Sequence, residues 1–145
     1  MRFWALISLL DWSKAGDEKA VVEPLVASLS GMTEEVIRKF QDILSEKLWC
    51  LDTEAHALAS LGNDVNKPIS VDYFLYDRCY VIAMGASFYE KVLHDPSEFP
   101  AGCSFEELLY VATAAFEKKT GKTYFLHVPA FDYETYSNEI GWPEP

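Results

Sequence analysis

One short stretch of the chain concentrates ionisable and hydroxyl-bearing side chains. Asp72 and Tyr76 stand four residues apart, and Tyr73 and Asp77 repeat that spacing, so each pair would share one face of a helix. Arg78 follows directly. Charges on an otherwise apolar helix are costly to bury without partners, so these groups must pair across the fold or line a cleft.

Two interpretations of this cluster stay open at the level of sequence. In the first, it forms an internal network that joins its helix to another element through Glu46 or Asp52. In the second, it is the floor of a polar pocket rimmed by aromatic residues near the C-terminus, with Arg78 available to an anionic ligand. The candidate binding residues are then Asp11, Trp12, Asp72, Tyr73, Tyr76, Arg78, Tyr136, Asn138 and Trp142.

No catalytic or metal-binding motif accompanies the cluster. The three histidines stand on separate segments, and only the Glu90–His94 pair has helical spacing, which gives too few ligands for a metal. Thr120-Gly121-Lys122-Thr123 resembles the end of a phosphate-binding P-loop, but Phe116 stands where that loop needs a glycine. We therefore expect no catalytic residue, no metal site and no cofactor.

Cysteine usage and the N-terminal segment bear on the cellular compartment. Cys50, Cys79 and Cys103 are odd in number and far apart, which is typical of free thiols in a reducing cytoplasm. The apolar run Phe3–Leu10 is too short to span a membrane. Its apolar residues share one helical face, which favours a first helix over a signal peptide. We expect a cytoplasmic protein.

The composition excludes two classes of function. The chain has 145 residues, half of them hydrophobic, which suits one domain with a substantial core. It has 12 basic and 23 acidic residues, for a formal net charge of −11. Such a charge argues against direct nucleic-acid binding and against docking on an anionic membrane, because both need a basic footprint.

Helical periodicity dominates the chain up to Gly121. We expect a mostly α, single compact domain over residues 1–145, whose helical body, 1–121, contains about six helices. The expected helices cover residues 3–10, 18–29, 34–51, 53–61, 70–94 with a bend or break at Gly85, and 104–120. Ser104 and Glu107 have the spacing of a capping box that would start the last helix.

Residues 122–145 are expected to form an irregular strap. This segment has no helical stripe but is rich in aromatic residues: Tyr124, Phe125, Phe131, Tyr133, Tyr136 and Trp142. Tyr124–Val128 has the composition of one short strand. Six large rings are unfavourable in water, so we expect the strap to pack on its own helical body rather than extend towards a partner.

Several motifs together carry a family resemblance. They are Phe3-Trp4-Ala5-Leu6-Ile7, Leu10-Asp11-Trp12-Ser13, Phe40-Gln41-Asp42-Ile43-Leu44, Asp72-Tyr73-Phe74-Leu75-Tyr76 with Arg78-Cys79, Glu117-Lys118-Lys119-Thr120-Gly121, Tyr133-Glu134-Thr135 and Gly141-Trp142. In these segments the chain resembles the uncharacterised bacterial family called domain of unknown function 4240. The resemblance implies a small bacterial domain, sometimes fused in other proteins to a module linked with nucleic acids. It implies no activity, substrate or catalytic residue.

Two functions from different classes agree with these observations. The first is a non-enzymatic protein-binding module, either an immunity- or inhibitor-like protein or an adaptor. Its basic partner, such as a nuclease toxin, would be recognised by electrostatic steering and by mimicry of phosphate charge. The alternative is a small-molecule-binding domain or enzyme whose pocket surrounds Asp72, Tyr73, Tyr76 and Arg78.

Overall fold

Side chains that cap the N-termini of helices determine where four of the helices begin. In the computed structural model, which describes residues 2–144, Asp17, Thr33, Thr53 and Ser70 each accept a hydrogen bond from a backbone N–H in the first turn of the following helix. Such caps satisfy amide groups that the helix leaves without partners. The N-terminal boundaries of four helices therefore follow from single residues.

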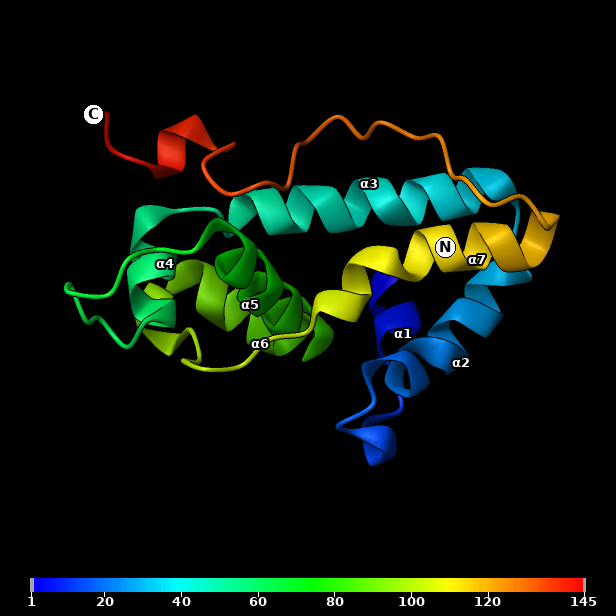
Figure 1. Ribbon diagram of the computed structural model, residues 1–145, viewed down its shortest axis with the longest axis horizontal. Helices are drawn as coiled ribbons and strands as arrows, with labels where there is room; N and C mark the ends of the chain where they lie inside the picture. Colours follow the sequence, from blue (N-terminus) through cyan, green and yellow to red (C-terminus); the bar gives the residue numbers. More distant parts are fainter. Residues whose placement is uncertain (1, 145) are drawn as a thin grey trace.

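Seven α-helices form the body of the described part of the chain (Figure 1). They are α1 (Phe3–Ile7), α2 (Glu18–Ser30), α3 (Glu34–Cys50), α4 (Glu54–Ser60), α5 (Val71–Ala83), α6 (Ala86–His94) and α7 (Val111–Thr120). The prediction of a mostly α domain is confirmed. The seventh helix arises because Gly85 has a φ of 104°, a left-handed conformation that separates α5 from α6.

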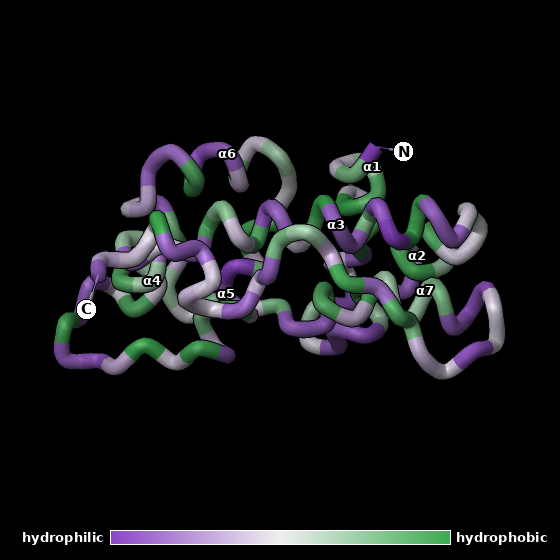
Figure 2. Tube along the Cα trace, turned by 90° about the horizontal axis from the view of Figure 1, so that it is seen from above, coloured by the Kyte–Doolittle hydropathy of each residue, from purple (hydrophilic) through white to green (hydrophobic). Residues whose placement is uncertain are grey.

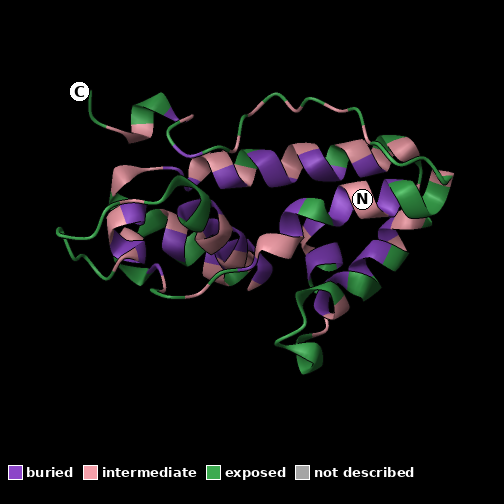
Figure 3. Ribbon diagram, in the orientation of Figure 1, coloured by how far each residue is buried: buried purple, intermediate pink, exposed green. Residues whose placement is uncertain are grey.

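The long helix α3 connects the two halves of the fold. In Figure 1 it runs above both groups, with α4, α5 and α6 below one half of it and α1, α2 and α7 below the other, and it packs directly on α5 and α7. Ile37, Phe40, Leu44 and Leu48 recur along its length and are fully buried. Figure 3 shows this buried side of α3 facing the other helices. No helix within residues 2–144 has the length and apolar character needed to cross a bilayer.

The predicted capping box over residues 104–107 is wrong. Residues Glu106–Tyr110 form a short 3₁₀ helix, η3, and α7 begins only at Val111. Tertiary contacts take over the role of the cap: the N–H of Phe105 donates to a carbonyl of α5 (3.0 Å), and the N–H of Glu107 donates to the carboxylate of Glu18 on α2 (3.2 Å). The C-terminal boundary follows the sequence, since Gly121 ends α7 with a φ of 72°.

The strap contains one turn of 3₁₀ helix, η4 (Glu139–Gly141), and no strand among its described residues, 122–144. The predicted strand at Tyr124–Val128 is therefore wrong: the segment has no neighbouring strand, and no backbone hydrogen bond joins residues 123–131 to the rest of residues 2–144. The strap crosses the body from the end of α7 along α3 (Figure 1). Hydrophobic and hydrophilic stretches alternate along it in Figure 2.

Burial along the strap nevertheless has the two-residue period of an extended chain. The side chains on the more buried face are Phe125, His127, Pro129, Phe131, Tyr133 and Thr135. The exposed face carries Tyr124, Leu126, Val128, Ala130, Asp132, Glu134 and Tyr136. One face of the strap therefore contacts the helices and the other faces solvent.

Candidate functional site

Arg78 lies at the junction of α3, α5 and the strap. Its side chain has no solvent exposure, and Nη1 donates to the carbonyl of Leu48 (2.8 Å) while Nη2 donates to Oγ1 of Thr135 (3.1 Å). The guanidinium also lies 4.7 Å from the ring centre of Phe74. Burial lowers the pKa of Arg78, and the Asp52 carboxylate opposes that shift. A ligand in solvent would reach this arginine only by displacing the strap.

Asp52, directly after α3, holds the C-terminal part of the strap. Its Oδ1 accepts hydrogen bonds from the N–H of Tyr136 (3.2 Å) and the indole N–H of Trp142 (3.0 Å), and its Oδ2 accepts one from the N–H of Asn138 (3.0 Å). The Asn138 amide also donates to the carbonyl of Trp49 (3.1 Å). We call Asp52, Tyr136, Asn138 and Trp142 the strap anchor. These three C-terminal candidates and Arg78 thus lie together in an internal network.

The other candidates on α5 point in different directions. Asp72 and Tyr73 are exposed, Tyr73 by 71%. Tyr76 faces η3, where hydrogen bonding to Glu106 raises the pKa of its hydroxyl to about 12. Because Arg78 is buried on a further side, the structure does not gather these residues into one pocket.

Asp11 and Trp12 belong to the segment that joins α1 to α2, and Figure 1 shows these two helices on the far side of α7 from the strap. Asp11 caps the 3₁₀ turn η1 (Trp12–Lys14) by accepting from the N–H (3.1 Å) and hydroxyl (2.5 Å) of Ser13, and these bonds lower its pKa. Trp12 packs on Phe105, with ring centres 5.1 Å apart. Asp11 thus stabilises the local connection between α1 and α2, and Trp12 packs that connection on the segment before η3.

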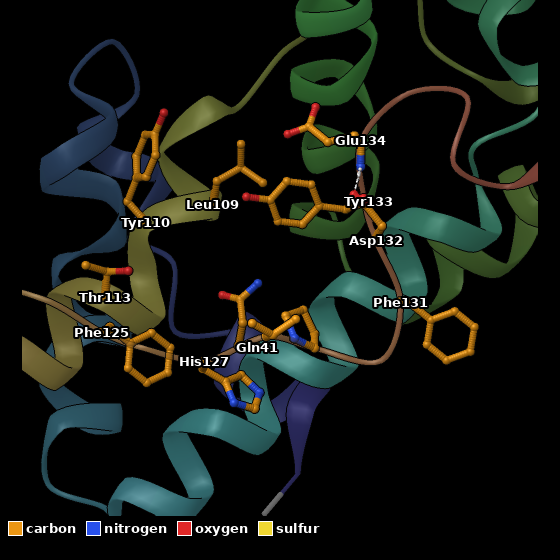
Figure 4. Close-up of a pocket in the computed structure, with 12 residues that line it drawn as sticks. Gln41, Leu109, Tyr110, Thr113, Phe125, His127, Phe131, Asp132, Tyr133 and Glu134 are labelled. Atoms are coloured by element: carbon orange, nitrogen blue, oxygen red, sulfur yellow. Dashed lines mark hydrogen bonds between the residues drawn. The ribbon is translucent and has the colours of Figure 1, made fainter.

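A pocket of about 390 Å³ opens between the strap, α3 and α7 (Figure 4). We call it the central strap pocket, and its lining includes Gln41, Tyr110, Thr113, Phe125, Phe131, Asp132, Tyr133 and Glu134. Burial raises the pKa values of Tyr110 and Tyr133, so both hydroxyls stay protonated at neutral pH. Aromatic rings, hydroxyls and two carboxylates therefore surround the same space.

Gln41 forms the floor of the central strap pocket. Only 9% of this α3 residue is exposed, and its Nε2 donates to Oγ of Ser45 (3.0 Å). Its carbonyl oxygen has no hydrogen-bond partner within residues 2–144. Figure 4 shows the amide directed into the space between Thr113 and Tyr133. The side chain is mostly buried, but its carbonyl oxygen is open to the pocket, where an entering group can reach it.

The strap is fixed over this pocket by side chains on its buried face. His127 Nε2 lies 2.6 Å from Oδ1 of Asp42 on α3. Phe125 packs on Phe116 of α7, with ring centres 5.1 Å apart. These contacts hold one wall of the pocket to both helices without any backbone pairing.

A second pocket, of about 660 Å³, lies at the end of the strap. We call it the terminal strap pocket; it is lined by Glu54, Ile69, Tyr136, Glu139, Trp142, Pro143 and Glu144. Its two aromatic rings meet edge to face, with centres 4.5 Å apart. Tyr136 has a φ of 79°, which is rare for a bulky residue, and its N–H is held by Asp52. The strap anchor therefore also positions the walls of this pocket.

Sequence reasoning missed Gln41, Asp132, Tyr133 and Glu134 as pocket residues. The available signal was the alternation over residues 124–136, where Phe125, Phe131 and Tyr133 all fall on the more buried face. That pattern marks an extended segment lying on a surface, but it does not identify the surface. Within residues 2–144, no three histidine, cysteine or acidic side chains converge as a metal site requires.

These features define a class of protein: an all-helical domain closed by an anchored, aromatic C-terminal strap with two pockets along it. The chain belongs to the family described as "Protein of unknown function (DUF4240)", whose model matches residues 1–118. The matched region ends within α7, so the resemblance of the strap motifs lies outside it. No curated protein and no solved structure matched the chain.

Proposed function

We propose that this protein is a non-enzymatic protein-binding module, an inhibitor- or adaptor-like domain that holds a basic partner protein. One observation carries the proposal. Both strap pockets are lined by aromatic rings and carboxylates, and no lysine or arginine among the described residues lines either of them. Aromatic faces and carboxylates both attract cationic groups, so the strap is chemically matched to a basic surface.

The exposed face of the strap supplies an apolar centre for the interface. Leu126 and Val128 are 81% and 92% exposed, and Tyr124 beside them is exposed as well. Asp132 and Glu134 continue the same face towards the terminal strap pocket. An apolar centre with charged residues at its edge is the usual composition of a protein–protein interface.

The overall charge supports the same kind of partner. With 23 acidic and 12 basic residues, the net charge of −11 would speed association with a basic protein and repel nucleic acids and anionic membranes. We place this function in the cytoplasm, because Cys50, Cys79 and Cys103 are all free thiols, as is usual in a reducing compartment.

Affinity capture from the cells that produce the protein tests this proposal. The bait is the full chain, and the comparison is a double variant, Leu126→Ser with Val128→Ser. Val65→Ser is the matched control, since Val65 is 82% exposed but lies on the loop between α4 and α5. We expect the wild type and the control to capture a protein of pI above about 9, and the double variant to lose it.

The salt dependence of binding tests whether charge attraction drives that capture. We expect release as NaCl rises from about 0.05 to about 0.5 M, because screening shortens the range of charge attraction. A captured protein that is acidic, that stays bound through this series, or that the double variant retains would contradict the proposal, as would the absence of any salt-sensitive basic partner.

A second candidate function is supported by Asp77. Its half-buried carboxyl has a pKa raised by burial to about 6 and lines a hollow of about 540 Å³ with Ser60, Lys67, Tyr73 and Ser104. A carboxyl that titrates near neutrality in a hollow is typical of acid–base or ligand-binding sites. Under this alternative, Asp77→Asn abolishes binding of a cell-derived small molecule, detected by mass spectrometry, and leaves capture of the basic partner unchanged.

A further inference from the structure

We infer that the central strap pocket receives a single cationic side chain, a lysine or arginine, from the basic partner. This inference rests on the proposed function and adds the group that is recognised. Both side chains share the chemistry that matters: an apolar stem that ends in a positively charged group with hydrogen-bond donors only.

The floor of the pocket offers an acceptor to such a head group. The carbonyl oxygen of Gln41 has no partner, while its amide nitrogen is committed to Ser45. The hydroxyls of Thr113 and Tyr133 make no hydrogen bond within residues 2–144, so they can accept as well as donate, and no lysine or arginine of residues 2–144 lines the pocket. A ligand that consists of acceptors, such as a phosphate or a carboxylate, would find no free cation there, because His127 is engaged with Asp42.

The walls suit the stem of a long side chain and its charge. Phe125 and Phe131 of the strap and Tyr110 and Tyr133 border the space. Rings hold alkyl groups by burial of apolar surface, and their faces attract ammonium and guanidinium groups. A volume of about 390 Å³ admits one such side chain with accompanying water.

The edge of the pocket carries negative charge. Asp132 and Glu134 line it from the exposed face of the strap, and Asp132 is held by a hydrogen bond that it accepts from the N–H of Glu134 (2.9 Å). Both carboxylates retain lone pairs for a ligand. The charge is thus placed where an entering cation passes from water towards Gln41.

Titration with capped amino acids tests this inference without the partner. N-acetyl-arginine methylamide and N-acetyl-lysine methylamide are added to the ¹⁵N-labelled full chain and followed by NMR, with the citrulline analogue as a neutral equivalent of arginine. We expect both cations to shift the Gln41 side-chain amide and the backbone amides of Thr113, Asp132 and Glu134. The citrulline analogue should bind at least about fivefold more weakly, because it lacks the charge.

A matched pair of variants locates the binding. The double variant Asp132→Asn with Glu134→Gln changes only exposed residues and should weaken both cations by about threefold to tenfold. Glu117→Gln removes an exposed acid of α7 outside the pocket lining and should leave the affinity unchanged. Shifts at another surface, equal binding of citrulline, or equal weakening by Glu117→Gln would each overturn the inference.

The two proposals fail in distinguishable ways. If the capped amino acids do not bind while capture of a basic protein stays salt-sensitive, the pocket inference is overturned and the proposed function stands. If they bind at the pocket but no basic protein is captured, the proposed function fails and the pocket is a site for small organic cations.

Discussion

Asp77 shows how a single half-buried carboxyl can cost stability. Its carboxyl is half-buried and has no hydrogen-bond partner within residues 2–144, so the charged form is poorly solvated and its pKa rises to about 6. Arg78, its neighbour, is fully buried but has two hydrogen-bond acceptors and the ring of Phe74. Arg78 therefore has more partners than Asp77, although its Nε makes no hydrogen bond within residues 2–144.

Replacing Asp77 by asparagine should stabilise the fold at neutral pH. The shift from 3.8 to about 6 corresponds to about 3 kcal/mol, and partial access to water reduces the expected gain to about 1–2 kcal/mol at pH 7.5. A raised folded-state pKa gives stability that is present below pH 4 and is lost as the pH rises through 6. The gain from Asp77→Asn should therefore shrink as the pH falls from 7.5 to 4.

Urea unfolding of both proteins across that pH range measures this difference. A gain that stays constant with pH would show that lost charge is not its cause, and a loss of stability at pH 7.5 would mean that the Asp77 carboxylate has a favourable partner.

At the scale of elements, the position of the strap depends on a close contact between the backbone of η4 and the residues that follow α3. η4 packs its Gly141 against the residues that follow α3, where an added Cβ would lie 2.6 Å from the carbonyl oxygen of Asp52 and 2.9 Å from Cγ2 of Thr53. Such distances force the strap away from the body. The same approach brings Trp142 within hydrogen-bond reach of Asp52.

The variant Gly141→Ala should loosen the strap anchor. We expect a loss of about 1–3 kcal/mol in the free energy of unfolding, because an overpacked contact displaces the segment and its hydrogen bonds. Hydrogen–deuterium exchange over residues 135–142 should rise while α2 and α7 stay protected. Gly31→Ala is the control, since its Cβ would meet only one atom, at an ordinary distance of 3.5 Å. Equal exchange in both variants would refute the role of this contact.

At the scale of the whole molecule, charge acts on folding and on binding in opposite directions. Acidic residues outnumber basic ones by 23 to 12, so the folded chain repels itself at low ionic strength. The ion pairs on its surface, such as Arg38–Glu34 at 3.7 Å, are partly exposed and offset little of this repulsion.

Salt should therefore stabilise the isolated protein while it weakens capture of the partner. We expect the Tm to rise by about 2–5 °C between about 0.05 and about 0.5 M NaCl, because screening relieves repulsion among the acids. Differential scanning calorimetry in NaCl and in KCl measures the effect, and screening requires the same rise in both. A Tm that falls with salt would mean that attractive pairs dominate the surface.

Local signals in the sequence accounted for most of the helical body. Thr33 and Ser70 cap helices as their side chains allow, Gly85 and Gly121 take left-handed conformations that end them, and the apolar stripe of α3 is buried along its length. The capping box at 104–107 failed because Glu18, 89 residues away in sequence, supplies the bond instead. The strand at Tyr124–Val128 failed because no second strand lies beside it.

The sequence by itself determined the helices, the acidic charge and the membership of its first 118 residues in a family, because these depend on residue types and short spacings. Only the tertiary structure decided that Arg78 is covered by Thr135 and that Gln41 faces a pocket under the strap. Those contacts join residues 57 or more positions apart, and their formation depends on how α3, α5 and the strap pack. A local sequence pattern cannot predict how α3, α5 and the strap pack together, because that packing depends on burial of the whole hydrophobic core.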